Sequence, residues 1–222
     1  MNFTGNKRKI FLVDDHPLVR EWLTNLINQQ PDLLVCGETE SAPAALSAIA
    51  AAQPDLAIVD ISLKNSSGVE LIKNLKELYP GVPVLVLSMH DESLYAERVL
   101  RAGARGYINK RETAQKVVDA IRRVLEGKLY VSEQIAEAMT IRALTGKPTA
   151  SQSPVELLSD RELEVFDKLG QGIGTRQIAE DLGVNIKTIQ AYCARIKEKL
   201  NLTSANKLLR EAILWNETKR SP

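Results

Sequence analysis

The sequence predicts an α/β domain, built on a doubly wound five-stranded parallel sheet, followed by a smaller all-α domain. Short apolar runs recur about every 25 residues as far as residue 109, and segments of helix length with apolar residues three or four positions apart lie between them. After residue 127 the short runs stop and the remaining apolar spacing is helical. Alternating strands and helices are typical of a parallel sheet that helices cover on both faces.

The five apolar runs are the predicted strands. The segments between them have the spacing of one buried helix face, as Leu18 and Trp22 do in the first segment and Val117 and Ile121 in the last. Strands are expected at residues 9–13, 33–37, 56–59, 84–88 and 106–109.

The chain after residue 128 divides into a linker and a helical domain. Residues 132–144 have the spacing of one more helix, and a stretch rich in Thr, Ser, Pro and Gly follows, as expected of a linker. The expected parts are an α/β domain at residues 7–128, a linker with one helix at 129–152 and a helical domain at 153–217.

Four helices are expected in the second domain. Ser159 and Glu162 form a capping box, which places the start of the first helix. The helices are expected at residues 159–169, 175–182, 186–200 and 204–215.

Composition restricts the cellular setting. No apolar stretch approaches the length that a membrane span needs, and residues 1–9 lack an apolar signal core. Cys36 and Cys193 stand far apart in apolar patterns, as expected of reduced thiols, and neither His16 nor His90 has zinc-site spacing to them. A cytoplasmic protein with no membrane partner is expected.

Positive charge is concentrated at the end of the chain. Residues 155–182 carry three basic and seven acidic side chains, a balance of −4, whereas residues 183–222 carry eight basic and three acidic ones, a balance of +5. The net charge of +1 conceals this gradient. A basic end suits a phosphate backbone, so the helical domain is a candidate for binding nucleic acid.

Polar residues stand at the carboxyl ends of four predicted strands. Asp14 and Asp15 follow the first strand and Asp60 the third, while Ser88 ends the fourth and Lys110 follows the fifth. These side chains are expected to converge, because the carboxyl ends of parallel strands form the binding crevice of such sheets. Three carboxylates in one small site need a cation between them, and oxygen ligands suit Mg²⁺. With a lysine and a hydroxyl added, the pattern predicts a site for a phosphoryl group.

Each residue also has a purely structural explanation. Asp15 could cap the helix that starts near Pro17, Lys110 could be a surface charge and Tyr107 a core aromatic. The combination of suitable types on four strand ends favours a functional site. A flavin enzyme would use the same sheet edge, but its phosphate needs a loop rich in Ser, Thr or Gly after the first strand, where this chain has two carboxylates.

Four segments resemble the signature segments of bacterial response-regulator receivers, which have a flavodoxin-like sheet: FLVDDHP, LAIVDISLKNSSG, VLVLSMH and GYINK. The resemblance covers residues 7–128. It implies that Asp60 accepts a phosphoryl group from a sensor histidine kinase. It also implies that Asp15 binds Mg²⁺ directly, that Asp14 supports the metal site, and that the backbone carbonyl of Ser62 supplies a further ligand.

The same resemblance assigns the residues around the phosphoryl group. Lys110 and Ser88 would hold its oxygens. Tyr107 would move with Ser88 as a switch pair, and the change would spread to the surface around the fourth helix and fifth strand.

The second domain resembles the LuxR-type DNA-binding domain of the NarL/FixJ response regulators. The segment LSDRELEVFDKLGQGIGTRQIAEDLGVNIKTIQAYCARIKEKLNLTS carries this resemblance within residues 153–217. It implies that residues 175–182 are the scaffold helix, Gly183 the turn glycine and Asn185 the cap of the recognition helix. It also implies binding to double-stranded promoter DNA as a homodimer, through the helix expected at 204–215.

The expected recognition helix has two faces. One is an apolar stripe that packs inward, formed by Ile189, Cys193, Ile196 and Leu200. On the other, small alanines leave room for a DNA groove, Gln190 has the donor and acceptor to read a base edge, and Lys187 or Arg195 can reach phosphate. The predicted DNA-binding residues are Lys187, Thr188, Gln190, Ala191, Ala194, Arg195 and Lys197.

Together these patterns predict a phosphorylation-dependent transcriptional regulator of a two-component system, and not an enzyme. The alternative is a phosphorylation-switched protein-interaction module whose helical domain does not bind DNA. A salt-titrated DNA-binding assay distinguishes the two, because phosphate contacts make DNA affinity fall steeply with salt.

Overall fold

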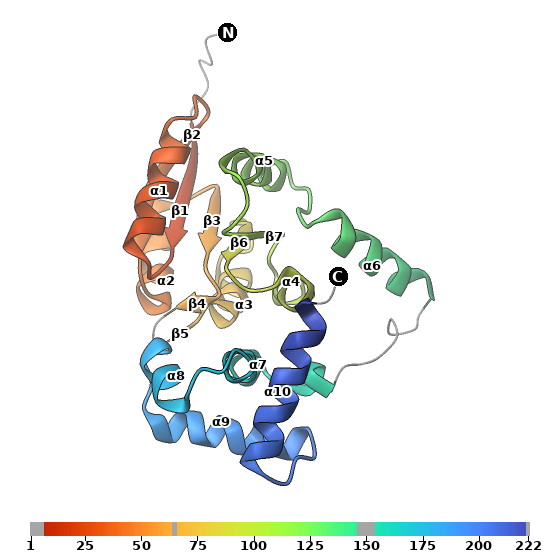
Figure 1. Ribbon diagram of the computed structural model, residues 1–222. Helices are drawn as coiled ribbons and strands as arrows, with labels where there is room; N and C mark the ends of the chain where they lie inside the picture. The colour runs from red at the N-terminus through yellow and green to blue at the C-terminus, as the bar shows by residue number, and fades with distance from the viewer. Residues whose placement is uncertain (1–6, 64–65, 146–153, 221–222) are drawn as a thin grey trace. The chain divides into compact units, whose positions relative to one another are not determined.

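The computed structural model describes residues 7–63, 66–145 and 154–220, and the chain divides into two compact units, Met1–Ile141 and Arg142–Pro222 (Figure 1). Helix α6 (Glu133–Thr145) agrees with the helix expected at residues 132–144. Of the expected linker at 129–152, residues 146–152 lie outside the described residues. Within the described part of the chain, no helix has both the length and the apolar character that crossing a bilayer requires.

Five parallel strands form the sheet of the first unit, in the order β2-β1-β3-β6-β7. This confirms the predicted doubly wound sheet. The strand order reverses between β1 and β3, which is the position where such sheets bind ligands. The strands are β1 (Arg8–Val13), β2 (Leu33–Thr39), β3 (Leu56–Val59), β6 (Val84–Ser88) and β7 (Gly106–Asn109).

Helices cover both faces of this sheet. On one face, Leu23 of α1 and Ile121 of α5 pack with the strand residues Ile10 and Ile58 in one apolar core. Helices α2, α3 and α4 lie side by side on the other face. Both faces are therefore buried, which explains why the strands read as continuous apolar runs. The helices are α1 (Pro17–Asn28), α2 (Ala42–Ala52), α3 (Gly68–Leu78), α4 (Glu92–Ala102) and α5 (Ala114–Leu125).

A short antiparallel pair, β4 (Ser62–Leu63) and β5 (Ser66–Ser67), follows β3. The sequence does not predict it, because strands of two residues carry no apolar period. The pair returns the chain to the end of β3, where the N–H of Gly68 donates to the carbonyl of Ile61 at 3.0 Å. A Cβ at Gly68 would stand 2.0 Å from the carbonyl oxygen of Asp60, so only glycine fits at this position.

Residues 154–220 of the second unit form a 3₁₀ turn followed by four α-helices. The capping box of Ser159 and Glu162 is present as predicted. Gly183 has a φ of 63°, which suits its predicted role in the turn, and the Asn185 side chain accepts from the N–H of Thr188 at 2.9 Å. The elements are η1 (Pro154–Leu157), α7 (Asp160–Gly170), α8 (Thr175–Asp181), α9 (Ile186–Lys199) and α10 (Ala205–Arg220).

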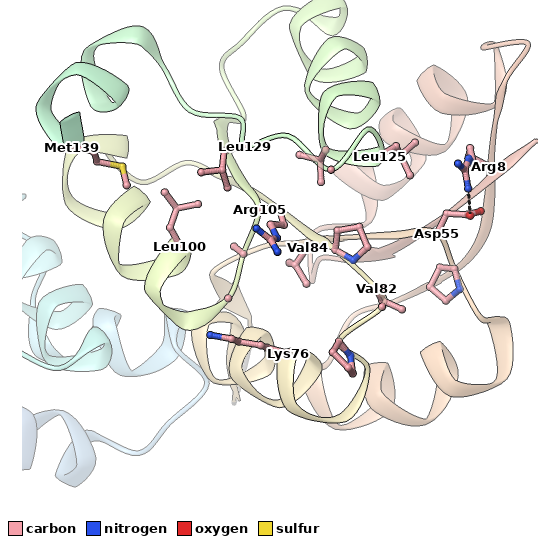
Figure 2. A pocket seen from close by; sticks show the side chains of 18 residues that line it. Arg8, Asp55, Lys76, Val82, Val84, Leu100, Arg105, Leu125, Leu129 and Met139 are labelled. Atoms are coloured by element: carbon pink, nitrogen blue, oxygen red, sulfur yellow. Dashed lines mark hydrogen bonds and ion pairs between the residues drawn. The ribbon is translucent and has the colours of Figure 1, made fainter. Parts of the chain in front are cut away.

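A hollow of about 830 Å³ lies at the amino ends of β3, β6 and β7 (Figure 2). Its lining includes Asp55, which pairs with Arg8 at 2.7 Å, and the side chains of Leu100, Leu129 and Met139. None of the polar residues predicted for the phosphoryl site lines this hollow. The two edges of the sheet are thus chemically distinct, and the predicted site lies at the carboxyl edge.

Candidate functional site

Strand register places the predicted site residues side by side. Val13 of β1 pairs with Val59 of β3, so the next residues, Asp14 and Asp60, leave the sheet together. The N–H of Asp60 donates to the carbonyl of Val13 at 2.9 Å, which extends the ladder by one residue. Ser88 pairs with Asn109 in the same way, and the N–H of Lys110 donates to the Ser88 carbonyl at 2.9 Å. The predicted convergence at this edge is therefore present.

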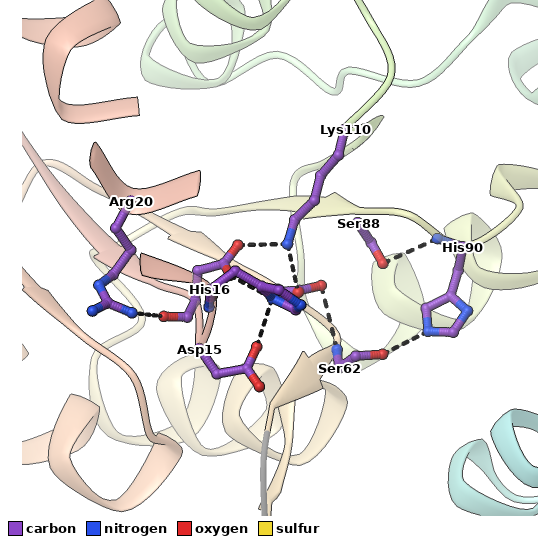
Figure 3. A network of polar contacts seen from close by, with 9 residues as sticks. Asp15, His16, Arg20, Ser62, Ser88, His90 and Lys110 are labelled. Atoms are coloured by element: carbon purple, nitrogen blue, oxygen red, sulfur yellow. Dashed lines mark hydrogen bonds and ion pairs between the residues drawn. The ribbon is translucent and has the colours of Figure 1, made fainter. Parts of the chain in front are cut away.

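Lys110 lies between two buried carboxylates (Figure 3). Its Nζ is 2.6 Å from Oδ2 of Asp14 and 2.7 Å from Oδ2 of Asp60. All three side chains are nearly inaccessible, with 6% of Lys110 and 3% of each carboxylate exposed. One ammonium cannot neutralise two buried carboxylates, and the Asp15 carboxylate lies beside them, so the site carries excess negative charge.

The excess negative charge affects the pKa of Asp60. Burial above all, together with the negative charge of Asp14, raises the pKa of Asp60 to about 6, although the Lys110 ammonium lowers it. Burial lowers the pKa of Lys110, but the two carboxylates outweigh burial and raise it above its ordinary value. Lys110 is therefore charged at neutral pH, and Asp60 is mostly ionised.

Four residues place possible metal-ligand atoms within 4.8 Å of one another: Asp14, Asp15, His16 and Asp60. The side chain of Asp15 is 9% exposed, and its Oδ1 accepts no hydrogen bond, although His16 Nδ1 lies 2.8 Å away. A buried carboxylate oxygen without a donor is costly unless a cation joins it. The donor set of carboxylate oxygens therefore fits a hard divalent cation.

Ser62 lies at the rim of this cluster. Its N–H donates to Oδ1 of Asp60 at 3.3 Å, so the backbone at Ser62 turns around the Asp60 carboxylate. Its hydroxyl is 2.7 Å from Nε2 of His90. The backbone position predicted to supply a metal ligand is therefore next to the cluster.

The backbone of His90 connects the two residues of the predicted switch pair. Ser88 Oγ accepts from the N–H of His90 at 3.3 Å, and the hydroxyl of Tyr107 donates to the carbonyl of His90 at 2.8 Å. Asn109 Nδ2 donates to the same carbonyl at 2.9 Å. Tyr107 is fully buried, and burial raises the pKa of its hydroxyl well above the ordinary value.

Sequence reasoning missed several of these neighbours. The His16 ring, the His90 ring and Asn109 all contact the site, and Arg20 donates to the backbone carbonyl of Asp14 at 2.6 Å. For the two histidines, closeness in the sequence was the available signal, since His16 and His90 each stand two residues after a predicted site residue. Which way their side chains turn depends on loop geometry, which apolar spacing does not report.

In the second unit, the predicted DNA-binding residues lie on the accessible side of α9. Lys187, Gln190, Ala191, Ala194 and Arg195 are exposed, and Thr188 and Lys197 are half-buried. The Arg195 guanidinium lies 5.6 Å from the centre of the Tyr192 ring.

The opposite stripe of α9 is less uniform than predicted. Ile189 and Ile196 are fully buried, whereas Cys193 and Leu200 are only half-buried. Burial is still sufficient to raise the pKa of the Cys193 thiol. The inward-facing part of the helix therefore centres on the two isoleucines.

An ion pair fixes α9 against α7. Lys199 Nζ lies 2.6 Å from Oε2 of Glu162, and the same oxygen accepts from the N–H of Ser159 at 2.8 Å. Burial raises the pKa of Glu162, but hydrogen bonds from Lys199 and Ser159 outweigh burial and hold the pKa below its usual range. Glu162 thus caps α7 and holds the end of α9 at once.

Comparison with known proteins identifies both units. Residues 10–122 match the response regulator receiver domain, and residues 156–212 match the bacterial regulatory proteins of the luxR family. The oxygen regulatory protein NreC of Staphylococcus epidermidis is 32% identical over 210 residues, which cover 92% of this chain and 96% of that protein.

Solved structures have the same architecture. A LuxR-family two-component response regulator from Aurantimonas sp. SI85-9A1 matches 63% of this chain and 99% of its own, at 30% identity and a TM-score of 0.58. RcsB of Salmonella enterica serovar Typhimurium matches 92% of this chain and 98% of its own, at 24% identity and a TM-score of 0.60, and shows the shared fold.

A receiver sheet followed by a helix-turn-helix domain defines the DNA-binding response regulators. The chain belongs to the NarL/FixJ family of response regulators, whose members are phosphorylation-dependent regulators of transcription.

Proposed function

We propose that Asp60 is the phosphoacceptor, that a sensor histidine kinase is the donor, and that phosphorylation controls how residues 153–217 bind promoter DNA. The observation that carries the proposal is the Lys110 ammonium between Asp14 and Asp60 at the sheet edge. A buried lysine there supplies the positive charge that an incoming phosphoryl group requires. In this proposal residues 7–128 form the receiver and the protein works in the cytoplasm, where it meets chromosomal DNA.

In the proposed reaction, a carboxylate oxygen of Asp60 attacks the phosphorus of a phosphohistidine on the kinase. The new P–O bond forms as the P–N bond breaks, and the leaving imidazole nitrogen takes a proton from water. Lys110 changes partner from the carboxylate oxygen to a phosphoryl oxygen. Asp15, Asp60 and the Ser62 carbonyl would hold Mg²⁺, with Asp14 in support, and the ion would supply charge opposite the phosphoryl oxygens.

The contacts of His90 support the proposed switch. Once Asp60 carries a phosphoryl group, the Ser88 hydroxyl has a stronger acceptor than its present environment offers, and moving toward it breaks the contact with the N–H of His90. Because Tyr107 bonds to the carbonyl of the same residue, a shift of the His90 backbone alters the position of Tyr107 as well. Local rearrangement then spreads to α4 and β7.

For the second domain, we infer that α9 enters the major groove of DNA. Its exposed face combines two alanines, which allow close approach, with Gln190 and the positive charges of Lys187 and Arg195. The Glu162–Lys199 pair supports this by holding the carboxyl end of α9 against α7. Helix α10 is proposed to form the homodimer contact, since Leu209, Ile213 and Leu214 remain exposed along it.

The phosphoacceptor assignment is tested by mass spectrometry of the intact chain. Incubation with a small phosphodonor and Mg²⁺ is expected to add one phosphoryl group to the natural protein and none to Asp60→Asn. Asp119→Asn is the matched control, because Asp119 is an exposed aspartate on α5 whose side chain accepts from Gln115. Undiminished labelling of Asp60→Asn would overturn the assignment.

A further inference from the structure

His16 lies against the acidic cluster although the fold does not require it there. It is the N-cap residue of α1, yet its side chain makes no capping hydrogen bond, and Pro17 follows it. Its ring is instead turned toward the carboxylates (Figure 3). Nδ1 stands 2.8 Å from Oδ1 of Asp15 and 3.1 Å from Oδ1 of Asp14.

These separations suit neighbouring ligands around one metal ion, and they also suit hydrogen bonds from Nδ1 to the carboxylates. Two ligands at right angles, each about 2.1 Å from an ion, lie about 3.0 Å apart. The ligand atom of Asp60 also falls within the 4.8 Å that encloses the group. The Asp15 Oδ1 atom, which is buried without a hydrogen-bond donor, faces the same space.

We propose that His16 supplies a nitrogen ligand to the metal site, so that the site favours a borderline divalent ion such as Co²⁺ over Mg²⁺. The inference rests on the proposed function, because it assumes that Asp14, Asp15 and Asp60 form a metal site. Imidazole suits borderline transition metals, whereas Mg²⁺ prefers oxygen and keeps water in the remaining positions. His16 is therefore a determinant of which ion the receiver carries, without being needed for Mg²⁺.

The same geometry has a competing explanation, in which Nδ1 of His16 only donates a hydrogen bond to the carboxylates. The two explanations predict opposite effects of removing the ring on Co²⁺ binding. A ligand lost weakens the binding of Co²⁺ and leaves Mg²⁺ unchanged, whereas a competing donor lost frees the carboxylate oxygens and tightens the binding of both ions. The ring is 60% exposed, so its replacement leaves the core of the fold untouched.

The test measures Co²⁺ and Mg²⁺ binding to the full chain by calorimetry at about pH 8, where free imidazole side chains are neutral. His16→Ala is expected to weaken Co²⁺ binding on the order of tenfold or more, the lower range of what altered partners cost metal sites. Mg²⁺ affinity is expected to stay within about twofold. His16→Lys, which introduces a positive charge and offers no nitrogen lone pair at this pH, is expected to lose at least as much Co²⁺ affinity as His16→Ala.

A spectroscopic readout accompanies the affinities. The chain has two histidines, so the ring signals of His16 and His90 can be assigned in the NMR spectrum by comparison with His16→Ala. Bound Co²⁺ is expected to shift the His16 signal strongly, and the visible absorption of Co²⁺ is expected to change in His16→Ala. Equal Co²⁺ affinity in the natural protein and His16→Ala, or tighter binding of both ions by His16→Ala, would overturn the role of His16. Failure of the natural protein to bind either ion would instead overturn the metal site of the proposed function, and with it this inference.

Discussion

At the scale of single residues, the buried carboxylates of the site repel each other. Asp14 and Asp60 are buried beside each other, and both form an ion pair with Lys110. The raised pKa of Asp60 means that the folded protein holds its proton more tightly than the unfolded chain does. An ionised Asp60 therefore destabilises the metal-free fold, and its negative charge would attract the cation that we propose for this site.

Asp60→Asn is expected to stabilise the metal-free protein at pH 7 by about 2–3 kcal/mol, which corresponds to a pKa raised from 3.8 to about 6. The sign follows from linkage: an acid whose folded pKa is raised loses stability as pH rises from its unfolded pKa to its folded pKa. The extra stability of Asp60→Asn over the natural protein should therefore vanish at about pH 4. Urea unfolding in the presence of a chelator measures this, with Asp119→Asn as control. A variant less stable than the natural protein at pH 7 would contradict the expectation.

At the scale of elements, the sequence predicts what apolar spacing determines. The five strands of the main sheet were predictable because both of their faces are buried, and α7 because a capping box marks its start. β2 continues through Glu38 and Thr39, and α10 continues to Arg220, because polar residues can extend an element that is already anchored. The pair β4 and β5 was missed because its form depends on the return of the chain to β3.

The residues of the site also divide into those that apolar spacing and strand ends predict and those that they do not. Asp14, Asp60, Ser88 and Lys110 were predictable because strand ends and register determine where they lie. The orientation of the His16 ring was not, since it depends on backbone torsions after the strand. In α9 the apolar stripe was correct for its two isoleucines, but helix spacing alone could not show that Cys193 sits at the edge of the packed face.

The accessible face of α9 is expected to separate base reading from phosphate binding. Gln190→Ala should cost about 1–3 kcal/mol on the preferred site and relax preference at one base position, because the amide offers both a donor and an acceptor. Lys187→Ala should weaken binding to all sequences alike and reduce the salt slope by about one unit. Titration of specific and random duplexes at several salt concentrations measures both. Unchanged sequence preference in Gln190→Ala would show that another face of α9 meets DNA.

At the scale of the whole molecule, α10 carries the exposed apolar surface through which we propose that the chain pairs. Leu208 and Ala212 are buried against the rest of the second unit, whereas Leu209, Ile213 and Leu214 remain exposed. Arg210 and Glu217 stand beside the exposed stripe, so a second copy of the helix in antiparallel orientation could satisfy both charges. A helix with two apolar faces can pack one face in the core of its own domain and the other against a partner.

Ile213→Glu is expected to leave the monomer folded and to abolish its pairing. The side chain is 37% exposed, so the carboxylate stays in water in the monomer, but in a symmetric dimer two such carboxylates would face each other in an apolar contact. Light scattering of the phosphorylated chain should then show a dimer for the natural protein and a monomer for Ile213→Glu.

DNA binding supplies the second half of this test. Joining two recognition helices makes the second contact intramolecular, so Ile213→Glu should lose about 10²-fold or more in affinity for an inverted repeat, yet bind a single half-site as the natural protein does. Thr218→Glu is the matched control, because it places the same carboxylate on an exposed position of α10 outside the stripe. Were Ile213→Glu to dimerise on phosphorylation and retain full affinity for the repeat, the pairing surface would have to lie elsewhere in the chain, and the exposed stripe of α10 would serve another partner.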